Sequence, residues 1–265
     1  MKLARALAAA AALAGGQAGA VEPPLPLRYD LAADLAVTAA ALASAAALAA
    51  LKPELTPLQC RICAPDPLDA AVRGALVWRD PQAAGTWSSA LANIAIPAGM
   101  LGYGFVSATL GGDPGAGAVD TLLVAEAVSL ATVVELGVKY GADRLRPYAW
   151  YGRTASPPGA YDRNLSFYSG HTSLAFATAT SAGTIFMMRG YPGAPLALAV
   201  GLAAAAGVGY LRMAADQHYL TDVLAGGAVG GLVGFAVPWI FHRPHAGAPG
   251  PGDLLPAPGG IAILW

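Results

Sequence analysis

The stretch RMAADQHYLTD, residues 212–222, and the uncharged run that follows it to residue 241 decide the fold expected for this chain. Apolar runs of about 20 residues are typical of helices that are buried or that cross a membrane. Arg212 closes one apolar run and Asp222 opens the next. His218 and Asp222 are four residues apart, so at the start of a helix they can share one face. The pattern predicts two apolar helices whose charged groups gather at one shared end.

The same alternation of apolar runs and breaks extends outward over much of the chain. Apolar helices are expected at residues 31–51, 89–111, 117–139, 172–188, 194–211 and 222–241, with a shorter helix near 68–78. Asp120, Glu126 and Glu135 interrupt the run 117–139. Carboxylates face lipid only at high cost, so this helix is expected inside the bundle. The predicted fold class is all-α: a bundle of five or six apolar helices, embedded in a membrane.

The composition supports this class. Hydrophobic residues make up 56% of the 265 residues and charged residues only 12%. The mean hydropathy is +0.52, above that of an ordinary soluble domain. Abundant alanine and 33 glycines favour close helix contacts through small residues. The net charge of −1 gives no reason to expect a nucleic-acid partner. Because several runs are short, a secreted, soluble helical bundle is the alternative.

The first 20 residues have the layout of a secretory signal peptide. Lys2 and Arg5 precede a short apolar stretch that ends in Ala18-Gly19-Ala20, a small-residue site that predicts cleavage before Val21. The alternative is an uncleaved first anchor.

Cys60 and Cys63 form a C-x-x-C motif. In an exported protein this pair most simply forms a disulfide; a redox motif or half of a zinc site is the alternative. The chain has no second cysteine pair, so no metal is expected. The remaining chain divides into an N-terminal helix and proline-rich connector (21–86), a helical-bundle domain (87–243) and a Pro/Gly-rich tail (244–265).

The distribution of basic residues predicts an orientation. With alternating spans, Arg189 and Arg243 fall at one end of the bundle and the loop that follows residue 139 at the other. The positive-inside tendency puts the two arginines in the cytoplasm. The loop and the cysteine pair then face the periplasm, or the whole protein is periplasmic.

Three cations and a serine-glycine-histidine turn indicate a site for a phosphate-like anion. Lys139, Arg146 and Arg212 are expected at helix ends, and arginine suits bidentate contact with phosphate oxygens. Ser169-Gly170-His171 opens the helix 172–188, whose N-terminus attracts anions. The alternatives without anion binding are a helical ion pair of Lys139 with Glu135 and an ordinary helix cap at Ser169.

These groups can transfer a phosphoryl group without a metal. His218, oriented by Asp222, would attack phosphorus, and His171 would protonate the leaving oxygen. The cations would stabilise the developing charge. Arg144 and Arg153 are expected to be solvated loop charges.

In order and spacing, K-x6-R-P, S-G-H and R-x5-H-x3-D resemble the type 2 phosphatidic acid phosphatase superfamily, which includes bacterial acid phosphatases and vanadium haloperoxidases. The resemblance runs from about residue 117 to 241. It implies a helical bundle, a phosphohistidine intermediate and no metal for hydrolysis. It assigns His218, His171 and Asp222 to catalysis and Lys139, Arg146, Ser169, Gly170 and Arg212 to phosphate binding. Tyr168 and Leu211 depart from the family pattern, which has proline and serine there.

The loop 148–168 suggests the kind of substrate. It holds six of the 21 aromatic residues: Tyr148, Trp150, Tyr151, Tyr161, Phe167 and Tyr168. Such a cluster suits a membrane interface or a lid over an apolar substrate, or it is simply loop packing. It favours a lipid phosphate monoester or diphosphate. The alternatives are a soluble broad-specificity acid phosphatase, a vanadate-dependent haloperoxidase and a non-catalytic protein that binds anionic lipid.

Overall fold

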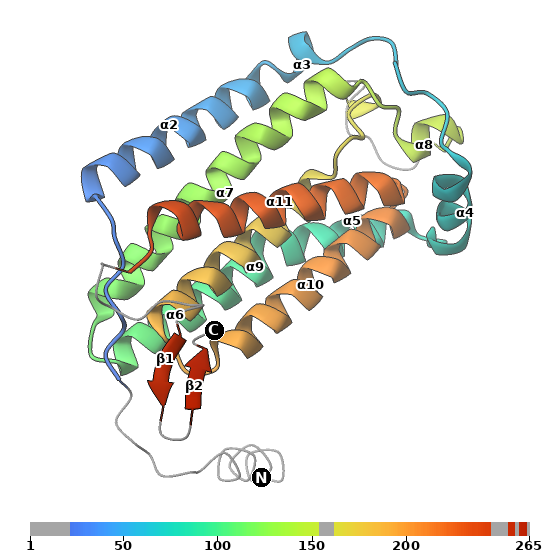
Figure 1. Cartoon of the computed structure of the whole chain (residues 1–265). Helices are drawn as coiled ribbons and strands as arrows, with labels where there is room; N and C mark the ends of the chain where they lie inside the picture. Colours follow the sequence, from blue (N-terminus) through green and yellow to red (C-terminus); the bar gives the residue numbers. More distant parts are fainter. Residues whose placement is uncertain (1–21, 154–161, 245–253, 258–259, 264–265) are drawn as a thin grey trace, which may run out of the picture.

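The computed structural model describes residues 22–153 and 162–244, together with the backbone of two short strands in the tail (Figure 1). The predicted signal peptide and Tyr161 lie outside the described residues. The elements are α2 (Leu31–Ala50), α3 (Lys52–Leu55), α4 (Pro67–Leu76), α5 (Pro81–Ala90), the π-helical segment η1 (Leu91–Ala95), α6 (Ile96–Leu110), α7 (Pro114–Ala142), α8 (Pro147–Trp150), α9 (Gly170–Arg189), α10 (Ala194–Ala214), α11 (Leu220–Phe241), β1 (Leu254–Ala257) and β2 (Gly260–Ile263).

Each apolar run expected to be helical is a helix. The clearest difference in length is at residues 89–111, where α5, η1 and α6 form one continuous 30-residue helical stretch from Pro81. Asp80 starts it early because its side chain accepts a hydrogen bond from the N–H of Ala83 and Pro81 occupies the first helical position. In the tail, β1 and β2 pair as an antiparallel hairpin that the sequence did not predict.

Helix α9 lies at the centre of the bundle. It packs against α6, α7, α10 and α11, and most of its side chains are buried (Figure 1). Helix α2 lies on the outside along α7. The central position of α9 places its N-terminus, with Ser169, Gly170 and His171, among the ends of the surrounding helices.

Three glycines allow α11 to pack closely on α9. Gly226, Gly230 and Gly234 are spaced four residues apart and so lie on one face. A Cβ atom at Gly226 would lie 2.6 Å from the carbonyl oxygen of Ser169, and the next two glycines meet the α9 backbone in the same way. Only glycine permits this approach, as in small-residue contacts of membrane helices. The packing holds the start of α11 beside the start of α9.

The acidic residues of α7 point inward, as predicted. Asp120, Glu126 and Glu135 are buried. Asp120 accepts hydrogen bonds from Arg189 Nε at 2.8 Å and from the Tyr191 hydroxyl at 2.7 Å. This buried ion pair compensates the charge at the end of the bundle where α9 finishes.

Five helical segments are long and apolar enough to cross a membrane: α2, the stretch from α5 to α6, α7, α10 and α11. Large apolar side chains on their outer faces are exposed, including Leu35, Leu196 and Leu232. Apolar surface of this extent needs a covering partner, and a bilayer provides one. The structure thus agrees with the predicted membrane-embedded helical bundle.

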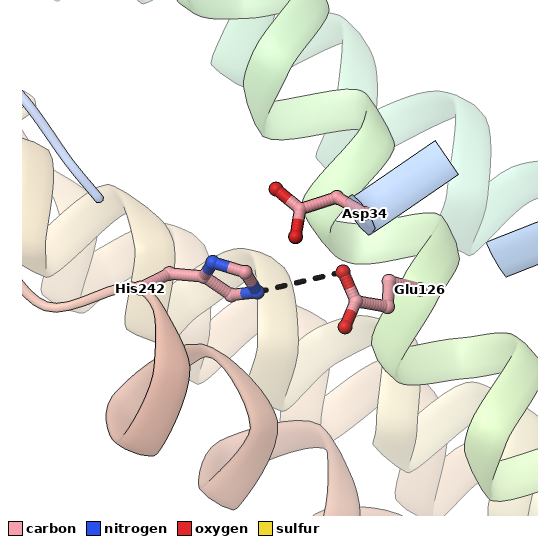
Figure 2. A group of neighbouring side chains, drawn as sticks. All are labelled: Asp34, Glu126 and His242. Atoms are coloured by element: carbon pink, nitrogen blue, oxygen red, sulfur yellow. Dashed lines mark ion pairs between the residues drawn. The ribbon is translucent and has the colours of Figure 1, made fainter. Parts of the chain in front are cut away.

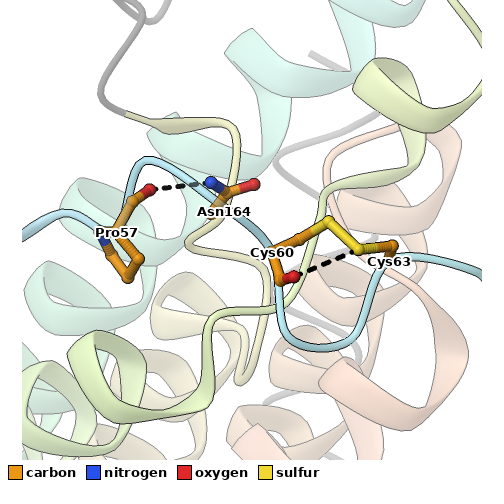
Figure 3. The surroundings of a disulfide bond; sticks show 4 residues. All are labelled: Pro57, Cys60, Cys63 and Asn164. Atoms are coloured by element: carbon orange, nitrogen blue, oxygen red, sulfur yellow. Dashed lines mark hydrogen bonds between the residues drawn. A yellow bond between two sulfur atoms is a disulfide. The ribbon is translucent and has the colours of Figure 1, made fainter.

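The connector between α2 and α5 contains α3 and α4. Together with α8 it covers one end of the bundle, here termed the loop end (Figure 1). A disulfide joins Cys60 and Cys63, and Asn164 Nδ2 donates to the carbonyl of Pro57 at 2.7 Å (Figure 3). The N–H of Leu145 donates to the carbonyl of Ile62. The connector is therefore fixed onto the segment that carries the first motif.

Candidate active site

All three sequence motifs meet at the loop end. Lys139 lies in the last turn of α7, Arg146 immediately before α8, and Arg212 in the last turn of α10. His171 lies in the first turn of α9, and His218 in the loop between α10 and α11. Contacts between these segments, described below, bring the predicted residues into one site.

The imidazole of His218 has one nitrogen fixed and the other turned toward the cations. Its Nδ1 lies 2.8 Å from the carbonyl oxygen of Ser166, so Nδ1–H is the donor and Nε2 carries the lone pair. Nε2 lies 3.2 Å from Arg146 Nη1, which donates to it. Burial, followed by the charges of Arg146 and Arg212, holds the pKa of His218 well below its usual range. His218 is therefore a neutral imidazole with its Nε2 available as a nucleophile.

Asp222 contacts His218 differently from the prediction. Its Oδ2 lies 3.7 Å from His218 Nδ1, which is too long for a direct hydrogen bond. Instead Asp222 accepts from the Ser166 hydroxyl at 2.6 Å and from the Tyr219 N–H at 2.9 Å. Ser166 thus links the pair, because its hydroxyl binds the carboxylate while its carbonyl binds the imidazole.

The expectation that Arg144 is a solvated loop charge is wrong. Arg144 is buried, with Nη1 2.6 Å from Asp222 Oδ1 and Nη2 2.6 Å from Asp69 Oδ2. Burial alone would lower the pKa of Arg144, but the Asp222 and Asp69 carboxylates outweigh it and raise that pKa. Arg144 therefore stays charged and holds Asp222 in place. Arg153 is exposed, as expected.

The two arginines among the predicted phosphate ligands differ in how many partners they have. Arg146 is held by the Asp162 carbonyl at 2.9 Å and by Gln217 Oε1 at 3.1 Å. Arg212 donates from Nη1 to Ser88 Oγ at 3.3 Å, while its buried Nε has no partner among the described residues. A buried guanidinium N–H without a partner is costly, and an anion bound there would satisfy it.

Lys139 forms the ion pair with Glu135 that the sequence offered as an alternative role. The pair also borders the start of α9. A Cβ atom at Gly170 would lie 2.6 Å from Glu135 Oε1 and 3.3 Å from Lys139 Nζ. Glycine is thus required for the backbone of α9 to approach these charges, and Lys139 remains beside the anion site.

The hydroxyl of Ser169 does not act as an ordinary helix cap. It shares a hydrogen bond of 2.8 Å with the Thr172 hydroxyl, and no side chain caps the N-terminus of α9. The first N–H groups of α9 are thus available to an anion. His171 Nε2 lies 3.2 Å from the hydroxyl of Ser89 on α5, a neighbour that the sequence did not reveal.

A cavity of about 260 Å³ opens beside His171, between α7, α9 and η1. Polar groups of Lys139, Glu135 and Asn93 line it together with the apolar side chain of Leu174. It therefore offers space next to the cations for the group that carries the phosphate.

The aromatic residues of the loop 148–168 divide between packing and surface. Tyr148 and Tyr168 are buried, whereas Trp150 and Tyr151 are 45% and 40% exposed. Of the two departures from the family pattern, Tyr168 is buried, and Leu211 is half-buried against a small cluster that includes Ala84 of α5. Neither side chain occupies the place of a group that could bind phosphate.

Sequence reasoning missed the residues that support the site: Asp69, Ser88, Ser89, Arg144, Asp162 and Ser166. For Asp69 and Arg144 a signal was present, because charged residues are scarce in this chain. The serines carried no such signal, since serine is common in loops and helices alike.

Fold and site together define a class: an apolar helical bundle with a buried histidine among cations at one end. The model of the PAP2 superfamily matches residues 120–245. This match confirms the resemblance predicted from the motifs, over the segment that carries all three of them.

Two relatives accompany this match. Over 122 residues the chain is 35% identical to the lipid A 1-phosphatase of Porphyromonas gingivalis. The aligned region covers 45% of this chain and 24% of that protein. The chain thus matches about a quarter of the length of that curated relative. A crystal structure of a transmembrane PAP2 type phosphatidylglycerolphosphate phosphatase from Bacillus subtilis superimposes with a TM-score of 0.46 at 20% identity, covering 78% of this chain and 94% of that one.

Proposed function

We propose that this protein is a lipid phosphatase that hydrolyses phosphate monoesters or diphosphates through a phosphohistidine at His218. The observation that carries the proposal is the orientation of the imidazole. Nδ1–H is bound to Ser166, so the lone pair of Nε2 faces Arg146 in a buried, cationic site. The PAP2 match and the name of the Porphyromonas relative support a phosphatase that acts on lipids.

In the first step the phosphate oxygens bind Arg146, Arg212, Lys139 and the free N–H groups of α9. His218 Nε2 attacks phosphorus as the bond from phosphorus to the ester oxygen breaks. Burial and the nearby cations lower the pKa of His171 to about 3 in the empty site, so His171 takes up its proton from the bound phosphate monoanion. It donates that proton to the leaving alkoxide, or to the lipid monophosphate when a diphosphate is cleaved. The fixed cations stabilise the charge that accumulates on the equatorial oxygens.

In the second step water breaks the bond between nitrogen and phosphorus. His171, now neutral, accepts a proton from that water as it attacks phosphorus. Inorganic phosphate leaves, His218 returns to its neutral form and His171 is again protonated. In the phosphorylated intermediate the His218 ring is cationic, and the Ser166 carbonyl and the carboxylate of Asp222 3.7 Å away stabilise that charge.

The surroundings of the site support a lipid substrate and an outward-facing orientation. The cavity beside His171 lies within a bundle whose helices can cross a membrane, and Trp150 and Tyr151 are exposed at the loop end, where they suit an interface. The disulfide lies at the same end, while Arg189 ends α9 and Arg243 comes two residues after α11, both at the opposite end of the bundle. An oxidising outer side and a basic inner side favour a site that faces the periplasm.

The test is phosphate release by the purified full-length protein in EDTA, with detergent-dispersed lipid phosphates compared with a soluble aryl phosphate. We expect turnover in EDTA with the lipids preferred, and stoichiometric acid-labile phosphate on the wild type. His218→Asn should lose both, while the Arg153→Gln control retains both. Full turnover by His218→Asn would refute the proposal, and a preference for the aryl phosphate would shift it toward an exported acid phosphatase.

A further inference from the structure

A second cluster of buried titratable side chains lies at the opposite end of α11 from His218. Asp34 in the first turn of α2, Glu126 on α7 and His242 just after α11 point toward one another (Figure 2). Their donor atoms lie within 4.8 Å of one another, and the three residues are 8%, 5% and 3% exposed. The 22 residues of α11 separate this cluster from the phosphate site by about 33 Å at 1.5 Å per residue.

His242 is oriented as metal-binding histidines are. Its Nδ1 lies 3.1 Å from the carbonyl oxygen of Arg28, so Nδ1–H is the donor and the lone pair is on Nε2. A backbone carbonyl that fixes the second ring nitrogen in this way is typical of a ligating histidine. Nε2 faces Glu126 Oε2 at 3.5 Å (Figure 2). With Nε2 unprotonated, two acceptor atoms face each other in a buried place; with Nε2 protonated, the two side chains form an ion pair.

Neither atom has another partner. Glu126 Oε2 and His242 Nε2 form no hydrogen bond with any described residue, and the same holds for the Thr38 hydroxyl one turn after Asp34. Asp34 Oδ2 accepts one hydrogen bond, from the N–H of Asp30 at 3.0 Å. Buried polar atoms without partners are uncommon and call for a bound group.

Among the described residues, only His242 can compensate the charge of the cluster, through its pair with Glu126. In residues 22–153 and 162–244, no lysine or arginine nitrogen lies within 4.0 Å of the carboxylate of Asp34 or Glu126. Arg189, which ends α9, is paired with Asp120, and Arg243 stacks on Trp239 at 4.2 Å. A protonated His242 can offset only one of the two buried carboxylates, whereas a divalent cation would neutralise both.

We propose that Asp34, Glu126 and His242 bind a divalent first-row transition cation of the zinc class. With bonds of about 2.1 Å, two ligand atoms of a tetrahedral site lie about 3.4 Å apart. The 3.5 Å between His242 Nε2 and Glu126 Oε2 matches that edge. One imidazole with two carboxylates suits Zn²⁺ better than Mg²⁺ or Ca²⁺, which prefer oxygen ligands alone.

The bound cation would be structural, and the proposed phosphatase chemistry does not require it. Helix α2 packs along α7 but has only three buried residues, Asp34, Thr38 and Ala41. A cation at this site would join three elements, α2, α7 and the end of α11. It would thereby fix the outermost helix to the bundle.

The experiment uses the full-length protein in detergent without a histidine tag, stripped with EDTA and dialysed against Zn²⁺. We expect one zinc per chain by elemental analysis and a rise of several degrees in the midpoint of thermal unfolding. Glu126→Gln and His242→Gln should each weaken zinc binding at least about tenfold and abolish the rise. Asp30→Asn is the matched control, because it keeps a good helix cap on α2 and removes no ligand; it should retain both effects.

His218→Asn should still bind zinc, which distinguishes this site from the histidines of the phosphate site. A wild-type protein that retains no stoichiometric zinc would overturn the proposal. So would zinc binding that persists unchanged in Glu126→Gln and His242→Gln. If those variants fail to fold, the wild-type and His218→Asn zinc contents still decide the question.

Discussion

Arg144 Nη1 lies 2.6 Å from Asp222 Oδ1, and this contact ties the segment of the first motif to the start of α11. The other arm of the guanidinium holds Asp69 on α4. Asp222 in turn binds Ser166, whose carbonyl fixes His218. Arg144, at one of the six unspecified positions of the first motif, thus positions the proposed nucleophile through a buried network.

Arg144→Met should destabilise the protein by about 3–5 kcal/mol, because it leaves Asp69 and Asp222 buried without a cation. It should also lower kcat more than it raises KM, since the orientation of His218 is disturbed while the phosphate ligands remain. Thermal unfolding and steady-state kinetics on a lipid phosphate measure both. Arg153→Met is the control, and this exposed residue should change stability by no more than about 0.5 kcal/mol. Equal effects of the two substitutions would contradict the assigned role.

Gly226→Ala should impair both stability and activity. The added methyl would lie 2.6 Å from the carbonyl of Ser169, so α11 must move away from the start of α9. Overpacking of this kind costs about 1–3 kcal/mol, and the shift separates His171 from His218. Gly207→Ala on α10 is the matched control, because a Cβ atom there meets no other atom within 4 Å. A Gly226→Ala protein that matches the control would show that this contact does not set the site geometry.

The acid limb of the pH–rate profile should reflect the lowered pKa of the His218 imidazole. Because burial and nearby arginines hold the pKa of His218 well below its usual range, the nucleophile stays unprotonated as the pH falls through about 6.5. Loss of kcat/KM from protonation of His218 should therefore begin only well below that pH. Arg146→Gln removes one of the charges that lower this pKa, so its acid limb should move to higher pH.

The same pKa of His218 sets the direction in which the free energy of unfolding changes with pH. The unfolded chain takes up a proton near pH 6.5 and the folded chain does not, so the free energy of unfolding falls as the pH drops below that value. His218→Asn should lessen this loss. An unchanged pH dependence of unfolding in His218→Asn would show that His218 is not held neutral.

Replacing Cys60 and Cys63 with serine should lower the stability of the loop end. The bond closes a short loop, for which chain entropy predicts about 2 kcal/mol. The loop pairs with the motif segment, because Ile62 and Leu165 both form bridges with Arg144. We expect a lower unfolding midpoint with activity retained at low temperature. Dithiothreitol should have the same effect on the wild type and none on the serine variant.

The sequence by itself determined the helices and the class of site. Apolar runs must be buried or placed in lipid whatever their neighbours, so their length and breaks are local properties, and α7, α10 and α11 lie where the pattern predicts. The three motifs likewise predict a nucleophile, an acid and cations, because few other chemistries use that set. The match over residues 120–245 confirms the family that these motifs indicated.

Only the tertiary structure decided which side chains support that chemistry. Arg144 meets Asp69 and Asp222 at sequence separations of 75 and 78 residues, and no periodic pattern records such contacts. Ser166 stands between Asp222 and His218, although their spacing alone suggested direct contact. Asp34, Glu126 and His242 lie on three separate elements and become neighbours only through the packing of α2, α7 and α11. The hydrophobic pattern specifies which faces are buried, whereas the partners of a buried charge depend on how those faces pack together.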